Sequence, residues 1–468
     1  MLSMLYGAIW MVQTTPFVHA SALPRDTAPV PNGGGVEFEA EFAEPGAGEI
    51  FLPAYQNDLA VELCTVPSVA LRSEDPPSRL RRLFQRPGQP AELARVAHEV
   101  EQIRGLKFRS PVATEFVTLE EISKREMGER SREKRARQVD RTKRMLVALG
   151  VAPEDVDLDP IFEAVVGDVS GFYMPKKDKL VAPANSGESL SDSDISVLAH
   201  ELEHALSDQA IGLPHAGRDS DATVAAGAVV EGAASLVEYR HFYSVGSTGV
   251  PDDAGEVPVP EPQVPHLVSD QLMFPYISGL EFVCSLYALG EWDAVNRALE
   301  DPPTTTAQVL WPMRYHVRDE ALPVKRLVPP GRGFRPLYSA PFGASELLAL
   351  FRSPGDEPEF AVMDPFDHAA AWGGGHMQLW ERGERTALGL SLVESRWRKG
   401  LCDSMGSWLE GAVTPGKLQG PYNVIESLGT TKSTFGRQGR IAVLACSGKK
   451  VQVAIAPSTR AAAAMLTI

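Results

Sequence analysis

Residues 191–210 of the chain read SDSDISVLAHELEHALSDQA, and this stretch carries the strongest pattern in the sequence. Apolar residues recur along it at helical spacing, at Ile195, Leu198, Leu202, Ala205 and Leu206. Ser191 or Ser193 can cap its start, while Gly212 and Pro214 stop it. The stretch therefore predicts one capped amphipathic helix.

Two histidines lie four positions apart inside this expected helix, in the HELEH sequence of residues 200–204. Residues i and i+4 share a helix face, so His200 and His204 can bind one metal ion. Glu201 is displaced by about 100 degrees around the axis, so it is expected to accept a proton from a zinc-activated water instead. Such a string also arises by chance, but its place in a capped helix after a hairpin favours a zinc site.

A catalytic zinc needs a third protein ligand and an open position for water. One zinc peptidase subtype, the metzincins, is excluded because the chain has Ser207 and Ala210 where that extension requires Gly and His. Glu231 lies on a later helix among small and apolar residues, where an unpaired carboxylate is costly. It is the preferred third ligand, and His215, just beyond a turn, is the alternative.

The HExxH motif followed by a Glu-Gly pair on a later helix resembles the gluzincin clan of zinc metallopeptidases. Further stretches resemble a group of uncharacterised bacterial proteins with that site: Ile103-Arg104-Gly105-Leu106, Gly171-Phe172-Tyr173, residues 200–209, Val230-Glu231-Gly232, residues 276–279, Pro302-Pro303 with Thr306, and Ala371-Trp372-Gly373-Gly374. The chain departs from that group at Trp311, where His is expected, and at Met174, where Asp often follows.

This resemblance implies a Zn²⁺ cofactor held by His200, His204 and Glu231, with Glu201 as the general base and a peptide or protein as substrate. An oxyanion donor is also required, and four side chains are candidates: Tyr239, His241, Tyr243 and Tyr276. Zinc-bound imidazoles usually donate their second N–H to a carboxylate or carbonyl, for which the candidates are Asp208, Asp219 and Asp221.

The fold class expected is α+β, with a zincin-like metallopeptidase domain, a helical N-terminal region and a separate C-terminal α+β domain. The boundaries expected are 1–22 for a signal peptide, 23–75 for a Pro/Gly-rich lead-in, 76–160 for the helical region, 161–320 for the metallopeptidase domain and 321–468 for the C-terminal domain. A hairpin over 172–182 is expected to supply an edge strand for an extended substrate. Helices are expected over 221–243 and 279–299.

The charge of the chain disfavours nucleic acid as a partner. Its 468 residues carry a formal charge of −16 and give a pI near 5.2, whereas phosphate binding needs a basic surface. The basic run over 124–144 is interpreted as a solvated helix face. After the N-terminus, no stretch offers the roughly 18 apolar residues that a membrane span needs.

The N-terminus and the cysteines bear on location. Residues 1–22 are mostly apolar and end in small-x-small patterns typical of a cleaved signal, although they lack a basic start. An extracytoplasmic location is expected, with a cytoplasmic one as the alternative. Cys402 and Cys446 either pair or remain separate buried thiols. In an exported chain, residues 75–150 are a candidate inhibitory pro-segment.

Three functions fit these patterns. The leading hypothesis is a metallopeptidase. A non-catalytic, zinc-stabilised binding scaffold is the alternative from another class, and a zinc amidase acting on a non-peptide substrate is the third.

Overall fold

The computed structural model describes residues 64, 75–84, 89–90, 92–118, 121, 129–159, 171–183, 190–214, 217–244, 265–353, 362–413, 424–427, 430–437 and 440–468. The expected signal peptide and nearly all of the lead-in lie outside these residues, and so does His215. The described elements are mixed α+β, as expected.

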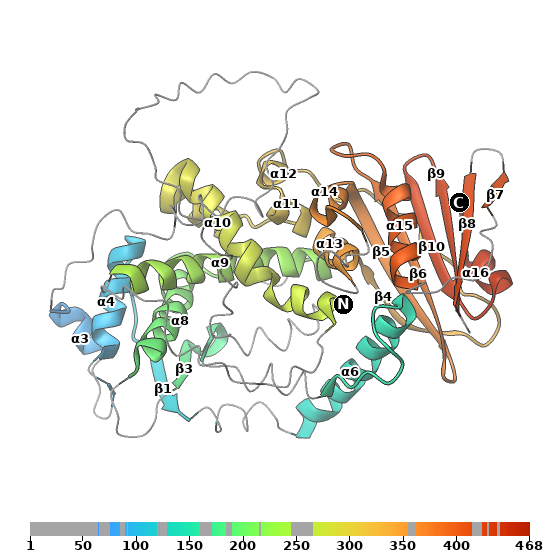
Figure 1. Ribbon diagram of the computed structural model, residues 1–468. Coiled ribbons are helices and arrows are strands. Elements are labelled where there is room, and N and C mark those ends of the chain that lie inside the picture. The colour runs from blue at the N-terminus through green and yellow to red at the C-terminus, as the bar shows by residue number, and fades with distance from the viewer. Residues whose placement is uncertain are drawn as a thin grey trace, which may run out of the picture.

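Two helices pack against the helix that carries the HELEH motif. The motif helix α8 (Asp192–Ala210) contacts α9 (Ser220–Ser244) on one side and α4 (Glu92–Arg104) on another (Figure 1). Ser191 caps α8 by accepting a hydrogen bond from the backbone N–H of Asp194, whose carboxylate accepts the Ser191 N–H in return. The expected helix is confirmed, and α9 matches the helix expected over 221–243.

A small sheet lies against the motif helix. Strands β2 (Phe172–Met174) and β3 (Lys179–Pro183) form the expected antiparallel hairpin, joined by a 3-10 turn at Pro175–Lys177. Strand β1 (Ala113–Val117) pairs with β3 in parallel, so the order is β1-β3-β2. Because β3 is central, β2 is the strand of the hairpin that lies at an edge of this sheet.

The long helix α10 (His266–Glu300) begins well before the expected start at residue 279, and it packs across α9 (Figure 1). It contains Pro275, which a sequence pattern treats as a helix stop. It is kinked near its end, where Glu291 adopts a left-handed φ of 50°. By length and composition, α10 is the one described helix that qualifies as a membrane span, yet half of the qualifying window is buried, which is equally typical of a core helix.

The C-terminal part contains one antiparallel seven-stranded sheet with the order β4-β5-β6-β10-β9-β8-β7. Its strands are β4 (Arg335–Pro341), β5 (Trp372–Arg382), β6 (Arg385–Glu394), β7 (Val424–Ser427), β8 (Thr430–Arg437), β9 (Arg440–Ser447) and β10 (Lys450–Ala456). Its helices are α13 (Ala344–Arg352), α14 (Pro365–Ala369), α15 (Leu401–Val413) and α16 (Thr459–Met465).

The two parts share one hydrophobic core. A single cluster of buried side chains includes Val229 of α9, Phe282 of α10, Leu347 of α13 and Leu390 of β6. Two short helices, α11 (Thr306–Leu310) and α12 (Pro312–His316), lie between them in sequence, and α11 contacts α9 and α13. In the described residues, the C-terminal α+β unit therefore packs against the helices around the motif through this common core.

The expected helical region 76–160 is divided between the two parts. Helix α3 (Ser78–Phe84) packs on α4, beside the motif helix, whereas α6 (Glu129–Leu149) contacts β6 of the large sheet (Figure 1). The guanidinium of Arg141 lies 5.2 Å from the ring of Tyr338 on β4. The boundary expected at residue 160 therefore does not mark a gap in packing.

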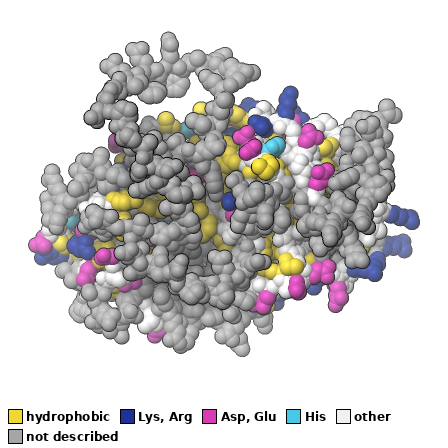
Figure 2. All heavy atoms as spheres, in the orientation of Figure 1, with side chains coloured by type: hydrophobic (Ala, Val, Ile, Leu, Met, Phe, Trp, Pro, Cys, Tyr) yellow, Lys and Arg dark blue, Asp and Glu magenta, His cyan; other side chains and the backbone are white. Residues whose placement is uncertain are grey.

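Two disulfides cross-link distant segments. Cys402 of α15 pairs with Cys446 of β9, one of the two arrangements considered from the sequence, and Cys64 pairs with Cys284 of α10. Disulfides persist in oxidising compartments, so the pairs are a weak indication of an extracytoplasmic setting. On the face shown in Figure 2, acidic and basic side chains of the described residues are interspersed.

Candidate metal centre

The two motif histidines are buried and face the same side of α8. His200 is 2% exposed and His204 is 3% exposed, and their ring centroids lie 4.9 Å apart. Ligand atoms of His200, Glu201 and His204 all lie within 4.8 Å of one another. The helix therefore places two imidazoles and one carboxylate where a single ion can reach them.

Glu231 enters this cluster from α9. Its Oε2 atom lies 3.4 Å from His200 Nε2 and 3.7 Å from His204 Nε2, and the residue is fully buried. In a tetrahedral zinc shell with bonds of about 2.0–2.1 Å, neighbouring ligand atoms lie about 3.4 Å apart. The distances from Glu231 to the two imidazoles therefore match that spacing.

Among the described residues, His204 Nε2 is a buried nitrogen with no hydrogen-bond partner. Buried polar atoms are normally satisfied, so an orphaned one calls for an explanation such as an ion. Neutral imidazole nitrogen and carboxylate oxygen are zinc donors. The residues present therefore fit a zinc ion.

Sequence reasoning did not include Glu238, which contacts a motif histidine. Its Oε2 lies 2.9 Å from His200 Nδ1. When Nδ1 donates its proton to this carboxylate, the lone pair of Nε2 faces Glu231 and the centre of the cluster. The signal was available, because Glu238 follows Glu231 by two helical turns and so shares its face of α9.

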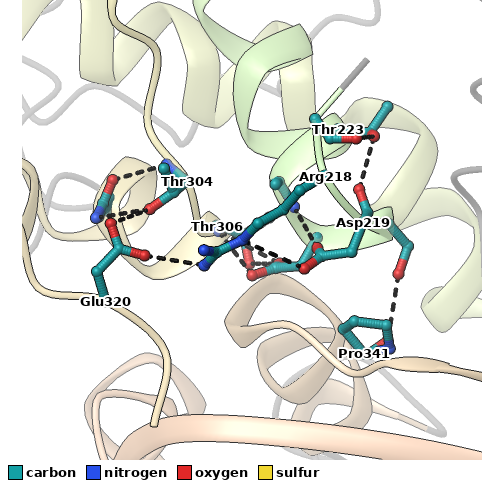
Figure 3. Close-up of polar contacts among 12 residues, drawn as sticks. Arg218, Asp219, Thr223, Thr304, Thr306, Glu320 and Pro341 are labelled. Atoms are coloured by element: carbon teal, nitrogen blue, oxygen red, sulfur yellow. Dashed lines mark hydrogen bonds and ion pairs between the residues drawn. The ribbon is translucent and has the colours of Figure 1, made fainter. Parts of the chain in front are cut away.

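The three aspartates considered for this orienting role have other partners. Asp208 accepts a hydrogen bond from the Tyr173 hydroxyl. Asp219 accepts a hydrogen bond from the Ala222 N–H at the start of α9, and Figure 3 shows Asp219 among the polar contacts around this helix start. Asp221 accepts from the hydroxyl of Thr306, at the start of α11.

Glu201 is completely buried, and burial raises its pKa to about 7 against the opposing effect of the two histidines. Neither carboxylate oxygen has a hydrogen-bond partner of ordinary geometry among the described residues. Burial also opposes ionisation of Glu231, but the neighbouring imidazoles of His204 and His200 lower its pKa to about 2. One carboxylate is thus poised to exchange a proton near neutral pH and the other stays ionised.

The position of Glu231 depends on a close crossing of α9 and α10. A Cβ added at Gly232 would lie 2.2 Å from the carbonyl oxygen of Gly279, and one added at Gly279 would lie 2.3 Å from the Ala228 oxygen. Neither distance is tolerable, so glycine is needed at both positions. The small residues of α9 therefore let α10 pack closely against it, and α9 is the helix that carries Glu231.

The structure separates the four candidate oxyanion donors. The Tyr276 ring lies 6.4 Å from the His200 ring. His241 is fully buried and bonded to Glu99 at 2.8 Å. Tyr239 stacks on Tyr243, which is 44% exposed.

Comparison of the chain with models of known families, with curated proteins and with solved structures gives no match. The resemblance to gluzincins therefore rests on the sequence motif alone.

Proposed function

We propose that the chain is a zinc-dependent metallopeptidase of gluzincin type. The observation that supports this most directly is the convergence of His200, His204 and Glu231, whose ligand atoms are separated by 3.4 and 3.7 Å. The sequence predicts that the two histidines share one helix and that Glu231 lies on another, but it does not show that these helices bring the three side chains together.

In this proposal His200, His204 and Glu231 hold the zinc, and Glu238 orients His200. When bound, zinc supplies a Lewis acid that polarises a carbonyl and lowers the pKa of water. Glu201 accepts a proton from the attacking water and passes it to the leaving amine.

Tyr276 is the best-placed candidate for stabilising the developing oxyanion, because it lies beside His200. The edge strand β2 favours a peptide as substrate, because an extended chain can pair with it. Gly171, directly before β2, packs against Glu201: a Cβ there would lie 3.5 Å from Glu201 Cγ.

The test is Glu201→Gln, measured for zinc content and for cleavage of a quenched-fluorescence peptide library. Zinc content should stay at one ion per chain, while turnover falls by at least about 100-fold because the general base is lost. Glu300→Gln, at an exposed position at the end of α10, is the matched control and should change neither value.

Undiminished turnover in Glu201→Gln would sink the proposal. A wild-type chain that binds zinc and cleaves no peptide would point instead to a scaffold, or to an amidase if a non-peptide amide is hydrolysed.

A further inference from the structure

Tyr173 lies in the middle of β2 and joins it to the motif helix. The side chain is 5% exposed, and its hydroxyl lies 2.9 Å from Asp208 Oδ2 and 3.0 Å from Asp178 Oδ1. Asp208 lies on α8, one helical turn beyond His204. A single hydroxyl proton is therefore shared between two carboxylates, one on the motif helix and one on the hairpin.

A second side chain reinforces the same connection. Asp178 ends the hairpin turn in a left-handed conformation, with φ 45°. Its carboxylate accepts from Gln209 Nε2 at 3.3 Å, and the Gln209 Oε1 accepts the backbone N–H groups of Arg109 and Ser110. The end of α8 is thereby bonded both to the hairpin and to the segment leading into β1.

The segment that leads into β2 contacts the proposed general base. Gly171, directly before β2, packs against the Glu201 side chain, because a Cβ added there would lie 3.5 Å from Glu201 Cγ. The Tyr173 side chain thus attaches β2 to α8 through Asp208, and the residue just before β2 contacts Glu201, the proposed general base.

We propose that Tyr173 is a positioning residue: its phenol, bonded to Asp208, holds β2 at a fixed distance from α8. This inference rests on the proposed function for its catalytic consequence. The clamp keeps the Gly171 backbone packed against the Glu201 side chain, and it keeps the edge of β2 aligned for an extended peptide. Misplacement of a reacting group by about 1 Å can cost about 100-fold in rate.

The test is Tyr173→Phe, which keeps the ring in its apolar surroundings of Leu180, Leu198 and Leu202 and removes only the hydroxyl. With the zinc-loaded chain, amide hydrogen exchange at residues 172–174 should rise about tenfold or more, because the local opening becomes easier. Zinc content should not change. The kcat for a peptide substrate should fall roughly 10- to 100-fold.

Tyr315→Phe is the matched control. Tyr315 lies in α12, away from the site, and is 7% exposed. Its hydroxyl donates a hydrogen bond to the Asp301 carbonyl. This variant should leave both exchange over 172–174 and kcat unchanged.

Variants of Asp208 distinguish a clamp from general packing. Asp208→Asn keeps an oxygen acceptor for the phenol, so its kcat and its hydrogen exchange over 172–174 should stay within about threefold of the wild-type values. Asp208→Ala should have the same effects as Tyr173→Phe. The double variant Tyr173→Phe/Asp208→Ala should show no larger change in kcat or in hydrogen exchange than either single variant.

Unchanged exchange over 172–174 in Tyr173→Phe, or additive effects of the two substitutions, would overturn the clamp. If exchange rises while the wild-type chain cleaves no peptide, the clamp stands and only the proposed peptidase activity fails.

Discussion

The contact between Glu238 and His200 Nδ1 determines how that imidazole presents Nε2. The carboxylate is 15% exposed and lies 2.9 Å from the ring nitrogen. A carboxylate in this place fixes the tautomer and the ring orientation, and it makes the imidazole a better donor.

We therefore expect Glu238→Gln to weaken zinc binding by roughly 10- to 100-fold, because the amide cannot accept the Nδ1 proton with the strength of a carboxylate. Competition with a chelating dye measures the affinity. Glu300→Gln serves as the control, and equal zinc affinities for Glu238→Gln and the wild type would rule out this role.

The fourth motif residue, Glu203, points away from the cluster toward Arg104. The Arg104 Nε and Glu203 Oε1 atoms are 2.8 Å apart, with side chains 0% and 1% exposed, and Arg104 also stacks 4.0 Å from the Trp292 ring. A buried carboxylate that loses its partner costs about 3–5 kcal/mol.

Arg104→Met should therefore lower the free energy of unfolding by about 3–5 kcal/mol, measured by urea denaturation. Glu203→Gln together with Arg104→Met should be less destabilising than Arg104→Met alone, because no charge is then left unpaired. A double variant that is the least stable of the set would contradict this explanation.

Among the elements, those with strong local signals were predictable from sequence. The capping box and apolar repeat identify α8, and alternation around a turn identifies the β2–β3 hairpin. The start of α10 was missed because Pro275 normally ends a helix, and here packing against α9 overrides that preference. The pairing of β1 with β3 is non-local, so no local pattern contains it.

The close crossing of α9 and α10 leaves no room for a side chain at Gly232. Gly232→Ala should separate the helices and displace Glu231, which reduces zinc affinity at least about tenfold and lowers stability by about 1–3 kcal/mol. Zinc titration and thermal unfolding measure the two effects.

Gly406→Ala is the matched control, since it lies in α15 and a Cβ there meets only Leu444 at 3.8 Å. It should be neutral or slightly stabilising, because alanine favours the helix. Wild-type zinc affinity in Gly232→Ala would show that the crossing does not position the ligand.

Across the whole molecule, the junction between α9 and the C-terminal part contains a buried acid. Asp221 is 7% exposed, and burial raises its pKa to about 7, with Glu346 adding to the effect. Figure 3 shows neighbouring contacts, in which Arg218 reaches Glu320 and Thr306 lies close by. The sequence placed Asp221 at a helix start but could not reveal the core shared with residues beyond 321.

This junction should make stability depend on pH. Between pH 4 and 7 the folded chain keeps a proton on Asp221 that the unfolded chain has released, so this group makes unfolding easier as pH rises through that window. The contribution amounts to about 4 kcal/mol at most.

Asp221→Asn removes the titration, so its stability relative to the wild type should increase from pH 4 to pH 8, as measured by denaturation at each pH. A stability difference that is constant across this range would contradict the assignment.

The proposed function requires that His200, His204 and Glu231 bind one zinc ion. Anomalous diffraction at the zinc edge, from crystals of the zinc-loaded chain, tests it most directly. We expect one peak per chain, about 2.0–2.2 Å from both Nε2 atoms and a Glu231 oxygen. If no peak lies between these side chains, or if the zinc binds only elsewhere on the chain, the proposed zinc site is wrong.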